Sequence, residues 1–111
     1  MKPDFDNPIL IGNFAVDSGQ AMVGDPAYLK EWQLWDSDTE AFDVSDKRIG
    51  QYSYLGSCAT TLNAEYGELE FGKAVVFNTG FGDGLYPVYA ILDTETGKVA
   101  QVIIDFAEDQ D

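Results

Sequence analysis

TGFGDGLYPVYAI, residues 79–91, places three glycines and one aspartate ahead of an apolar run that contains a tyrosine–proline pair. A phosphate-binding loop would need its glycines to open a helix, so that backbone N–H groups and the positive end of the helix dipole meet the anion. The run that follows is typical of a strand. An EF-hand-like calcium loop would need oxygen ligands at alternate positions, whereas Asp83 is the only carboxylate in the stretch. The stretch therefore predicts a hairpin turn between strands at 73–78 and 85–92.

Two residues near the end of this stretch carry more specific expectations. Gly84 precedes the Leu-Tyr-Pro sequence and is expected to have a positive φ, where a Cβ is unfavourable. Pro87 cannot donate a hydrogen bond to a neighbouring strand. It is therefore predicted to lie in an edge strand, at the start of a strand or at a bulge.

Alternating apolar residues and turn signals divide most of the chain into short strands. Strands are predicted at residues 9–16, 20–23, 49–55, 73–78, 85–92 and 98–107. The turn sequence DSG predicts a hairpin between the first two strands, and DTETG predicts a hairpin between the last two. The segment 56–72 is compatible with a strand, a turn or one helical turn.

One short helix is predicted near residues 26–35. Asp25 is well placed as its N-cap, and Pro26 occupies the first helical position, where the missing N–H costs nothing. Aromatic and aliphatic side chains at helical spacing, Tyr28, Leu29, Trp32 and Trp35, are expected to pack on a sheet. With 111 residues, the chain is expected to form a single mainly β domain, residues 1–111. Its predicted architecture is a small antiparallel sandwich or open barrel of six or seven strands.

Several short motifs along the chain resemble the DUF4241 family of bacterial and phage proteins of unknown function. They are Asp-Ser-Gly, Asp-Pro, Gly-x-Tyr-Pro-Val and Val-Ala, made by Asp17, Ser18, Gly19, Asp25, Pro26, Gly84, Tyr86, Pro87, Val88, Val99 and Ala100. The resemblance extends from about residue 9 to residue 106. The chain is short for this family, and Lys98 stands where the family pattern leads us to expect an arginine. The resemblance implies one compact domain and no particular activity.

Twenty acidic residues against six basic ones give the chain a net charge of −14. This charge repels nucleic acids and anionic membrane surfaces and favours cations or basic protein surfaces. No apolar run approaches the length of about 18 residues that spans a bilayer, and the N-terminus does not resemble a signal peptide. The single Cys58 permits no disulfide within the chain. These features predict a cytoplasmic protein with no direct binding to nucleic acid or membrane.

The sequence contains no histidine, which excludes Ser-His-Asp and Cys-His nucleophiles in their usual form. Cys58 is expected to be a small buried residue, because no activating base lies near it in sequence. The predicted binding residues, all at turns or strand ends except for one tyrosine, are Asp17, Asp25, Asp83, Tyr86 and Asp105. Carboxylates at such positions can converge on a divalent cation or act in acid–base catalysis. Each aspartate can equally serve as a local turn former or helix cap.

The function predicted first is a non-enzymatic protein-binding or interaction module, of the kind of a phage or bacterial accessory factor, with no cofactor. Its expected partner is a protein with a basic surface. The acidic run at residues 36–46 is expected to be a solvated loop, or else a docking segment for such a partner. Three alternatives stay open: a cation-binding protein or carboxylate-based enzyme built on the turn aspartates, a mimic of DNA, and a small-molecule pocket.

Overall fold

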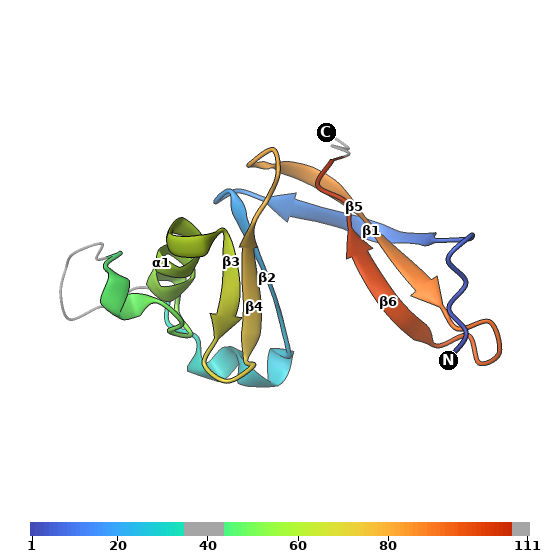
Figure 1. The fold of residues 1–111 in the computed structure, drawn as a ribbon, viewed down its shortest axis with the longest axis horizontal. Coiled ribbons are helices and arrows are strands. Elements are labelled where there is room, and N and C mark those ends of the chain that lie inside the picture. The colour runs from blue at the N-terminus through green and yellow to red at the C-terminus, as the bar shows by residue number, and fades with distance from the viewer. Residues whose placement is uncertain (35–43, 108–111) are drawn as a thin grey trace. The chain divides into compact units, whose positions relative to one another are not determined.

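The computed structural model describes residues 1–34 and 44–107, and within them six strands form two antiparallel sheets (Figure 1). The strands are β1 Ile9–Val16, β2 Gln20–Gly24, β3 Tyr66–Leu69, β4 Ala74–Asn78, β5 Gly84–Leu92 and β6 Val99–Ile104. The helices are the α-helix α1 Tyr54–Ala64 and the 3₁₀ segments η1 Pro26–Glu31 and η2 Asp46–Arg48. The predicted mainly β, antiparallel fold is confirmed, and no closed barrel forms in the described residues.

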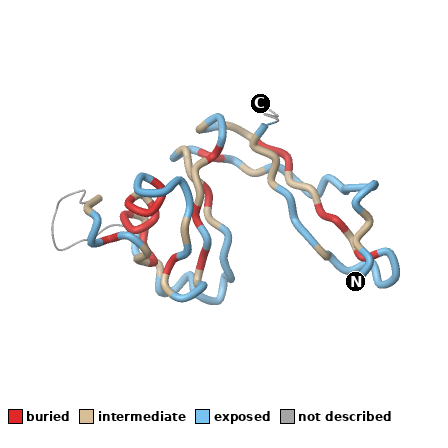
Figure 2. Tube along the Cα trace, in the orientation of Figure 1, coloured by how far each residue is buried: buried red, intermediate tan, exposed pale blue. Residues whose placement is uncertain are grey.

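The chain divides into two compact units, each built around one sheet. Residues Met1–Gly19 and Thr79–Asp111 form the first unit, which contains the sheet β1-β5-β6. Residues Gln20–Asn78 form the second unit, which contains the sheet β2-β4-β3 and α1. Buried residues concentrate on the central strands β5 and β4 and on α1 (Figure 2).

Strand β5 is the centre of the first sheet, paired antiparallel with β1 on one side and with β6 on the other. Tyr86 on β5 is fully buried, and its ring meets that of Phe106 edge-on with the ring centroids 5.1 Å apart. Such an aromatic pair removes a large apolar area from water. The predicted hairpin at DTETG is confirmed, because β5 pairs with β6 across it and Gly97 has a φ of +75°.

The second sheet and the residues around α1 share a small hydrophobic core. Tyr52, Leu69, Ala74 and Val76 form its buried cluster, against which Met22 and Trp32 pack. The helix lies close to β3, because a Cβ placed on Gly67 would come within 2.5 Å of the Thr60 methyl group. The glycine therefore allows helix and strand to approach each other closely.

The strand that the sequence predicts at 49–55 does not form, because a turn follows η2 and the last two of these residues begin α1. In the undecided segment 56–72, α1 continues to Ala64 and β3 follows it. Ser53 caps the helix, its side chain accepting a hydrogen bond of 2.8 Å from the Gly56 N–H. Glu65 ends it in the left-handed conformation with a φ of 72°. The threonine hydroxyls that suggested a strand instead bond back to carbonyls one turn earlier, as in the 2.7 Å bond from Thr60 to Gly56. The strand prediction at 49–55 is wrong, and the larger part of the segment left open at 56–72 belongs to a helix.

Two of the predicted hairpins do not form. β1 pairs with β5 and β2 pairs with β4, so the DSG turn leads from one sheet into the other. The glycine-rich stretch likewise leads from β4 into β5 and joins no hairpin. Both turns were predicted at the right places. The predicted pairing was wrong, because the two strands that each turn joins belong to different sheets.

The structure also corrects the expectations for Gly84 and Pro87. The positive φ in the glycine-rich turn belongs to Gly82, at +79°, and Gly84 is the first residue of β5. Pro87 lies within the central strand, where its carbonyl accepts a hydrogen bond of 3.1 Å from the Asp105 N–H. The N–H and C=O of one residue point to the same side of an antiparallel strand. Pro87 therefore lacks its N–H on the side that faces the end of β6, where the pairing of the two strands stops.

The predicted helix near 26–35 is present as the shorter η1. Asp25 caps it as expected, accepting a hydrogen bond of 2.9 Å from the Ala27 N–H, and Pro26 opens it. Of the side chains expected to pack on a sheet, Trp32 does so, with its ring 5.1 Å from that of Tyr52. Tyr28 and Leu29 are exposed, because a segment this short covers little of the sheet. Trp35 lies outside the described residues.

Candidate functional site

The sheet β1-β5-β6 contains no charged side chain in any of its three strands, although the chain as a whole carries −14. We refer to it as the uncharged sheet. Its edge strands expose large apolar side chains, with 47 % of Ile9, 54 % of Leu10, 55 % of Val102 and 44 % of Ile103 accessible to solvent. Exposed apolar side chains that gather on one element of structure are typical of contact sites.

The strand register places these exposed side chains on both faces of the uncharged sheet. Ile9 and Val102 flank Ala90 on one face, because both are paired with it. Leu10 and Ile103 flank Tyr89 on the other face in the same way. A sheet with one face in water alternates apolar and polar residues, whereas a sheet covered on both faces does not. The uncharged sheet has the second pattern.

Carboxylates surround the uncharged sheet at its turns. The described part of the first unit contains seven acidic residues and two lysines, none of them within a strand. The acidic residues are Asp4, Asp6, Asp17, Asp83, Asp93, Glu95 and Asp105. An apolar centre with a charged border is the usual anatomy of a protein interface. Here the border is mainly negative.

One of these carboxylates, that of Asp93, is buried and holds the N-terminus against the β5–β6 hairpin. It accepts hydrogen bonds of 2.6 Å from the Lys2 N–H, 2.9 Å from the Thr96 N–H and 2.6 Å from the Thr96 hydroxyl. These donors, the Thr96 side chain foremost, lower the pKa of Asp93 against the opposing effect of burial. Asp93 is therefore a structural anchor that the sequence analysis did not single out.

Three of the predicted site aspartates each accept a hydrogen bond from a backbone N–H group. Asp25 caps η1, Asp83 accepts a bond of 2.8 Å from Gly19, and Asp105 accepts one of 2.9 Å from Ala107. Asp17 is exposed at the turn after β1. No group of three or more histidine, cysteine or carboxylate side chains gathers within 1–34 and 44–107.

Asp83 and Tyr86 are the predicted site residues that meet at one place, the glycine-rich turn. The Tyr86 hydroxyl donates a bond of 2.8 Å to the Gly82 carbonyl, and the Asp83 carboxylate binds the Gly19 N–H. The Thr79 N–H donates a bond of 3.0 Å to the Gly19 carbonyl. These bonds join the two turns that lead out of the uncharged sheet. The buried Tyr86 therefore stabilises the glycine-rich turn through the bond from its hydroxyl to Gly82.

A second notable feature is the loop between β3 and β4. Three consecutive residues, Glu70, Phe71 and Gly72, have positive φ values of 35°, 57° and 87°. This is unusual for an aromatic residue. The Phe71 side chain is fully exposed, with a relative accessibility of 102 %. Such a conformation costs free energy and persists only where neighbouring contacts hold it.

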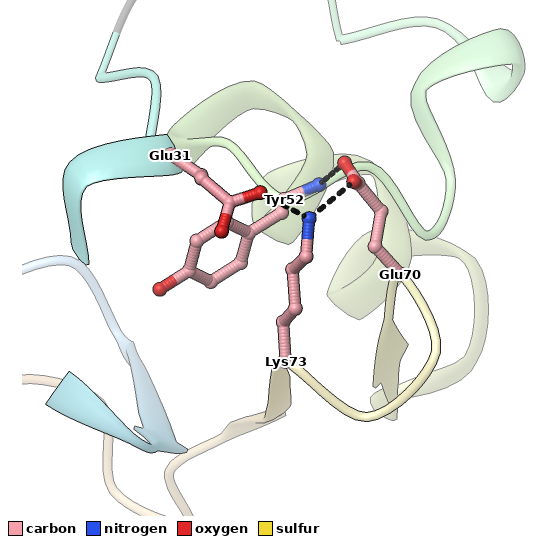
Figure 3. Close-up of polar contacts among 4 residues, drawn as sticks. All are labelled: Glu31, Tyr52, Glu70 and Lys73. Carbon is pink, nitrogen blue, oxygen red and sulfur yellow. Dashed lines mark hydrogen bonds and ion pairs between the residues drawn. The ribbon is translucent and has the colours of Figure 1, made fainter. Parts of the chain in front are cut away.

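Side chains at the base of this loop supply those contacts, as Figure 3 shows. Lys73 Nζ lies between two carboxylates, 2.8 Å from Glu31 and 3.3 Å from Glu70, and 5.7 Å from the centre of the Tyr52 ring. The other Glu70 oxygen accepts a bond of 2.6 Å from the Tyr52 N–H. This backbone donor is the main cause of the lowered pKa of Glu70, and the bond to Glu31 is the main cause of the raised pKa of Lys73. In the sequence, Gly72 at the end of EFG indicates a turn at this place, but nothing in the sequence indicates the cluster itself.

Cys58 and the acidic run complete the set of sequence-based expectations. Cys58 is half-buried on α1, and its sulfur accepts a bond of 3.2 Å from the Gln20 side-chain amide. The same amide group accepts a bond of 2.6 Å from the Ser57 hydroxyl through its oxygen. Of the acidic run, only residues 44–46 are described, and Asp46 begins η2. The rest of the run lies outside the described residues.

Comparison with known proteins identifies the class to which this fold and these motifs belong. Residues 9–104, nearly the whole chain, match the model of a family described as a protein of unknown function, DUF4241. The chain belongs to the DUF4241 family. No curated protein and no solved structure matches it. Among the described residues, no helix combines the length and the apolar character required to cross a membrane.

Proposed function

We propose that this chain is a non-enzymatic protein-binding module whose partner presents apolar side chains bordered by lysine and arginine. The observation that carries the proposal is the uncharged sheet. It exposes large apolar side chains on both faces in a chain with twenty acidic residues. The apolar centre would supply most of the binding free energy, and the carboxylates at its ends would select a basic partner and speed its approach.

The alternative is a cation-binding or carboxylate-based activity on the turn aspartates. A calcium or magnesium site takes several oxygen ligands on one ion. Asp25, Asp83 and Asp105 are each engaged with a separate backbone N–H group. We therefore favour the binding module, which uses the exposed surface of the first unit and needs no rearrangement of these turns.

The test uses the full chain as bait in lysate of a bacterial host, followed by purification of the captured protein and direct titration. Ile9→Ser and Leu10→Ser change one exposed side chain on each face of β1. Because both side chains are about half exposed, we expect each substitution to lower the free energy of unfolding by only about 1 kcal/mol, so both variants should fold. We expect each to weaken binding of the purified partner about tenfold, which corresponds to about 1.4 kcal/mol.

The matched control is Leu62→Ser, which changes an exposed leucine of α1 in the other unit. It should leave binding unchanged. Binding should also weaken as salt rises, because screening shortens the reach of the acidic border. Equal loss of binding in the control, or full binding by both β1 variants, would show that the contact site does not lie on the uncharged sheet. Binding that does not respond to salt would contradict the basic border of the partner.

A further inference from the structure

Strand β6 is an edge of the uncharged sheet, and its outer side is not paired with any strand of the described residues. Soluble proteins usually protect such edges with charged side chains, prolines, β-bulges or very short strands. The six residues of β6, VAQVII, include none of these devices except an irregularity in its register near Leu92. Its exposed position leaves a row of backbone donors and acceptors available for another strand.

The hydrogen bonds of β6 identify which backbone groups face outward. The Asp105 N–H donates to the Pro87 carbonyl, so this pair is a hydrogen-bonded one. Paired residues alternate along an antiparallel ladder between hydrogen-bonded and non-hydrogen-bonded positions. From the register of β5 and β6, Ile103 therefore points its N–H and C=O toward β5, and Val102 and Ile104 point theirs outward.

The charges at the two ends of β6 set it apart from the other edge strands. Lys98 directly precedes β6 and Asp105 directly follows it. The other three edge strands, β1, β2 and β3, have carboxylates within three residues of both ends: Asp6 and Asp17, Asp17 and Asp25, and Glu65 and Glu70. An antiparallel pair of identical strands brings the beginning of one beside the end of the other. That arrangement unites opposite charges only for β6.

We infer that β6 is a self-association edge, on which a second copy of this chain pairs antiparallel through its own β6. Centred on Val102, the pairing lets the outward groups of Val102 bond to those of its counterpart. Ala100 is an extra residue in β6, because Gln101 pairs with Ile91 and Val99 pairs with Leu92, so the pairing sets Ile104 opposite Val99. Each Lys98 then lies beside Asp105 of the other copy, so the twofold axis makes the ion pair twice. The uncharged sheets of the two copies then form one antiparallel sheet of six strands. The inference is independent of the proposed binding of a basic partner.

The experiment measures the mass of the full chain by sedimentation over a wide range of concentration. It is done at about 0.15 M salt, where a Debye length of about 8 Å screens the repulsion between two acidic copies. We expect a reversible dimer of twice 12.2 kDa. Val102→Pro should abolish it, because proline removes an outward donor that β5 does not use. Val102→Thr keeps the backbone N–H and the β-branched shape, and should still dimerise.

Charge exchange tests the register itself. Lys98→Glu and Asp105→Lys should each weaken the dimer about tenfold, because each turns two exposed ion pairs into two repulsive contacts. The double variant restores both pairs and should recover the wild-type dissociation constant. A chain that stays monomeric at every concentration would overturn the inference. So would a dimer that survives Val102→Pro in a chain whose circular dichroism is that of wild type, or a double variant no stronger than the single ones.

Discussion

The carboxylate of Glu70 accepts a hydrogen bond of 2.6 Å from the backbone N–H of Tyr52, a residue on the other side of α1 in the chain. The bond ties the start of the β3–β4 loop to the segment that leads into the helix. Tyr52 is a member of the buried cluster of the second unit. One exposed loop is thereby fixed to the core, and its left-handed residues are fixed with it.

Loss of this carboxylate should destabilise the chain. Glu70→Ala leaves the Tyr52 N–H without its acceptor, and we expect the free energy of unfolding to fall by about 1–2 kcal/mol, since an unpaired buried donor costs about 1–3 kcal/mol. Glu70→Gln keeps an acceptor oxygen and should cost about half as much. Urea unfolding curves of the three proteins measure the difference. If both variants lost the same free energy of unfolding, the negative charge of Glu70 would be responsible, and the acceptor oxygen would not.

The free energy of unfolding should fall as the pH becomes acidic, because the pKa values of Glu70 and Asp93 are lowered in the folded chain. A carboxyl whose folded pKa lies below its unfolded value contributes stability above the unfolded pKa and loses it as pH falls through the folded pKa. With unfolded values of about 4.3 for Glu and 3.9 for Asp, the loss begins near these values and is completed below them. Melting temperatures of Asp93→Asn measured across this range should depend less on pH than those of wild type. A curve parallel to that of wild type would contradict the role of Asp93.

The sequence predicted the positions of five strands well, because each of them combines β-branched or aromatic residues with a flanking turn signal. It did not predict their partners. The turns DSG and GFGDG look like hairpin turns, but which strand lies beside which depends on residues far apart, such as Val16 and Gly84. Periodicity within one segment contains no information about such pairs.

Helix α1 was missed for a different reason. Its sequence, YLGSCATTLNA, contains glycine, serine and two threonines, all of which have modest or poor helix propensity. Packing against the second sheet and the Ser53 cap outweigh that propensity. The Glu31–Lys73–Glu70 cluster was also missed, because Glu31 lies 42 residues before Lys73 in the sequence. The features that were predicted correctly in their local role, the Asp25 cap and the DTETG turn, depend on immediately neighbouring residues.

The left-handed loop leads to a prediction in which a substitution stabilises the chain. Phe71→Gly removes a Cβ from a residue with a φ of 57° and an exposed side chain with no core contact to lose. The left-handed region costs a residue with a Cβ about 1–2 kcal/mol, and the greater freedom of glycine in the unfolded chain offsets about 0.5–1 kcal/mol of the gain. We expect the free energy of unfolding to rise by about 0.5–1 kcal/mol.

The control for this variant is Phe81→Gly. Phe81 is also exposed, but its φ is not positive, so the substitution only adds freedom to the unfolded chain. It should leave the free energy of unfolding unchanged or lower it. Chemical denaturation of both variants beside wild type decides the matter. If Phe71→Gly lowered stability as much as the control, the loop would hold Phe71 without strain.

The glycine-rich turn supplies the last prediction, a comparison of two glycines two positions apart. A Cβ on Gly82 would meet no atom within 4 Å, so Gly82→Ala changes only the cost of its φ of +79°. We expect a loss of about 1–2 kcal/mol, which is the cost of the left-handed region for a residue with a Cβ. The carbonyl of Gly82 should keep its bond to Tyr86, so the fold should persist.

Gly84→Ala is the matched variant, because Gly84 begins β5 and does not have a positive φ. Alanine also restricts the unfolded chain more than glycine does, which favours the folded state by about 0.4–1 kcal/mol at a compatible position. We therefore expect Gly84→Ala to lose less stability than Gly82→Ala. Thermal melting of the two proteins side by side measures the difference. The reverse order would mean that the turn depends on the strand residue Gly84 and that the left-handed conformation of Gly82 is of little consequence.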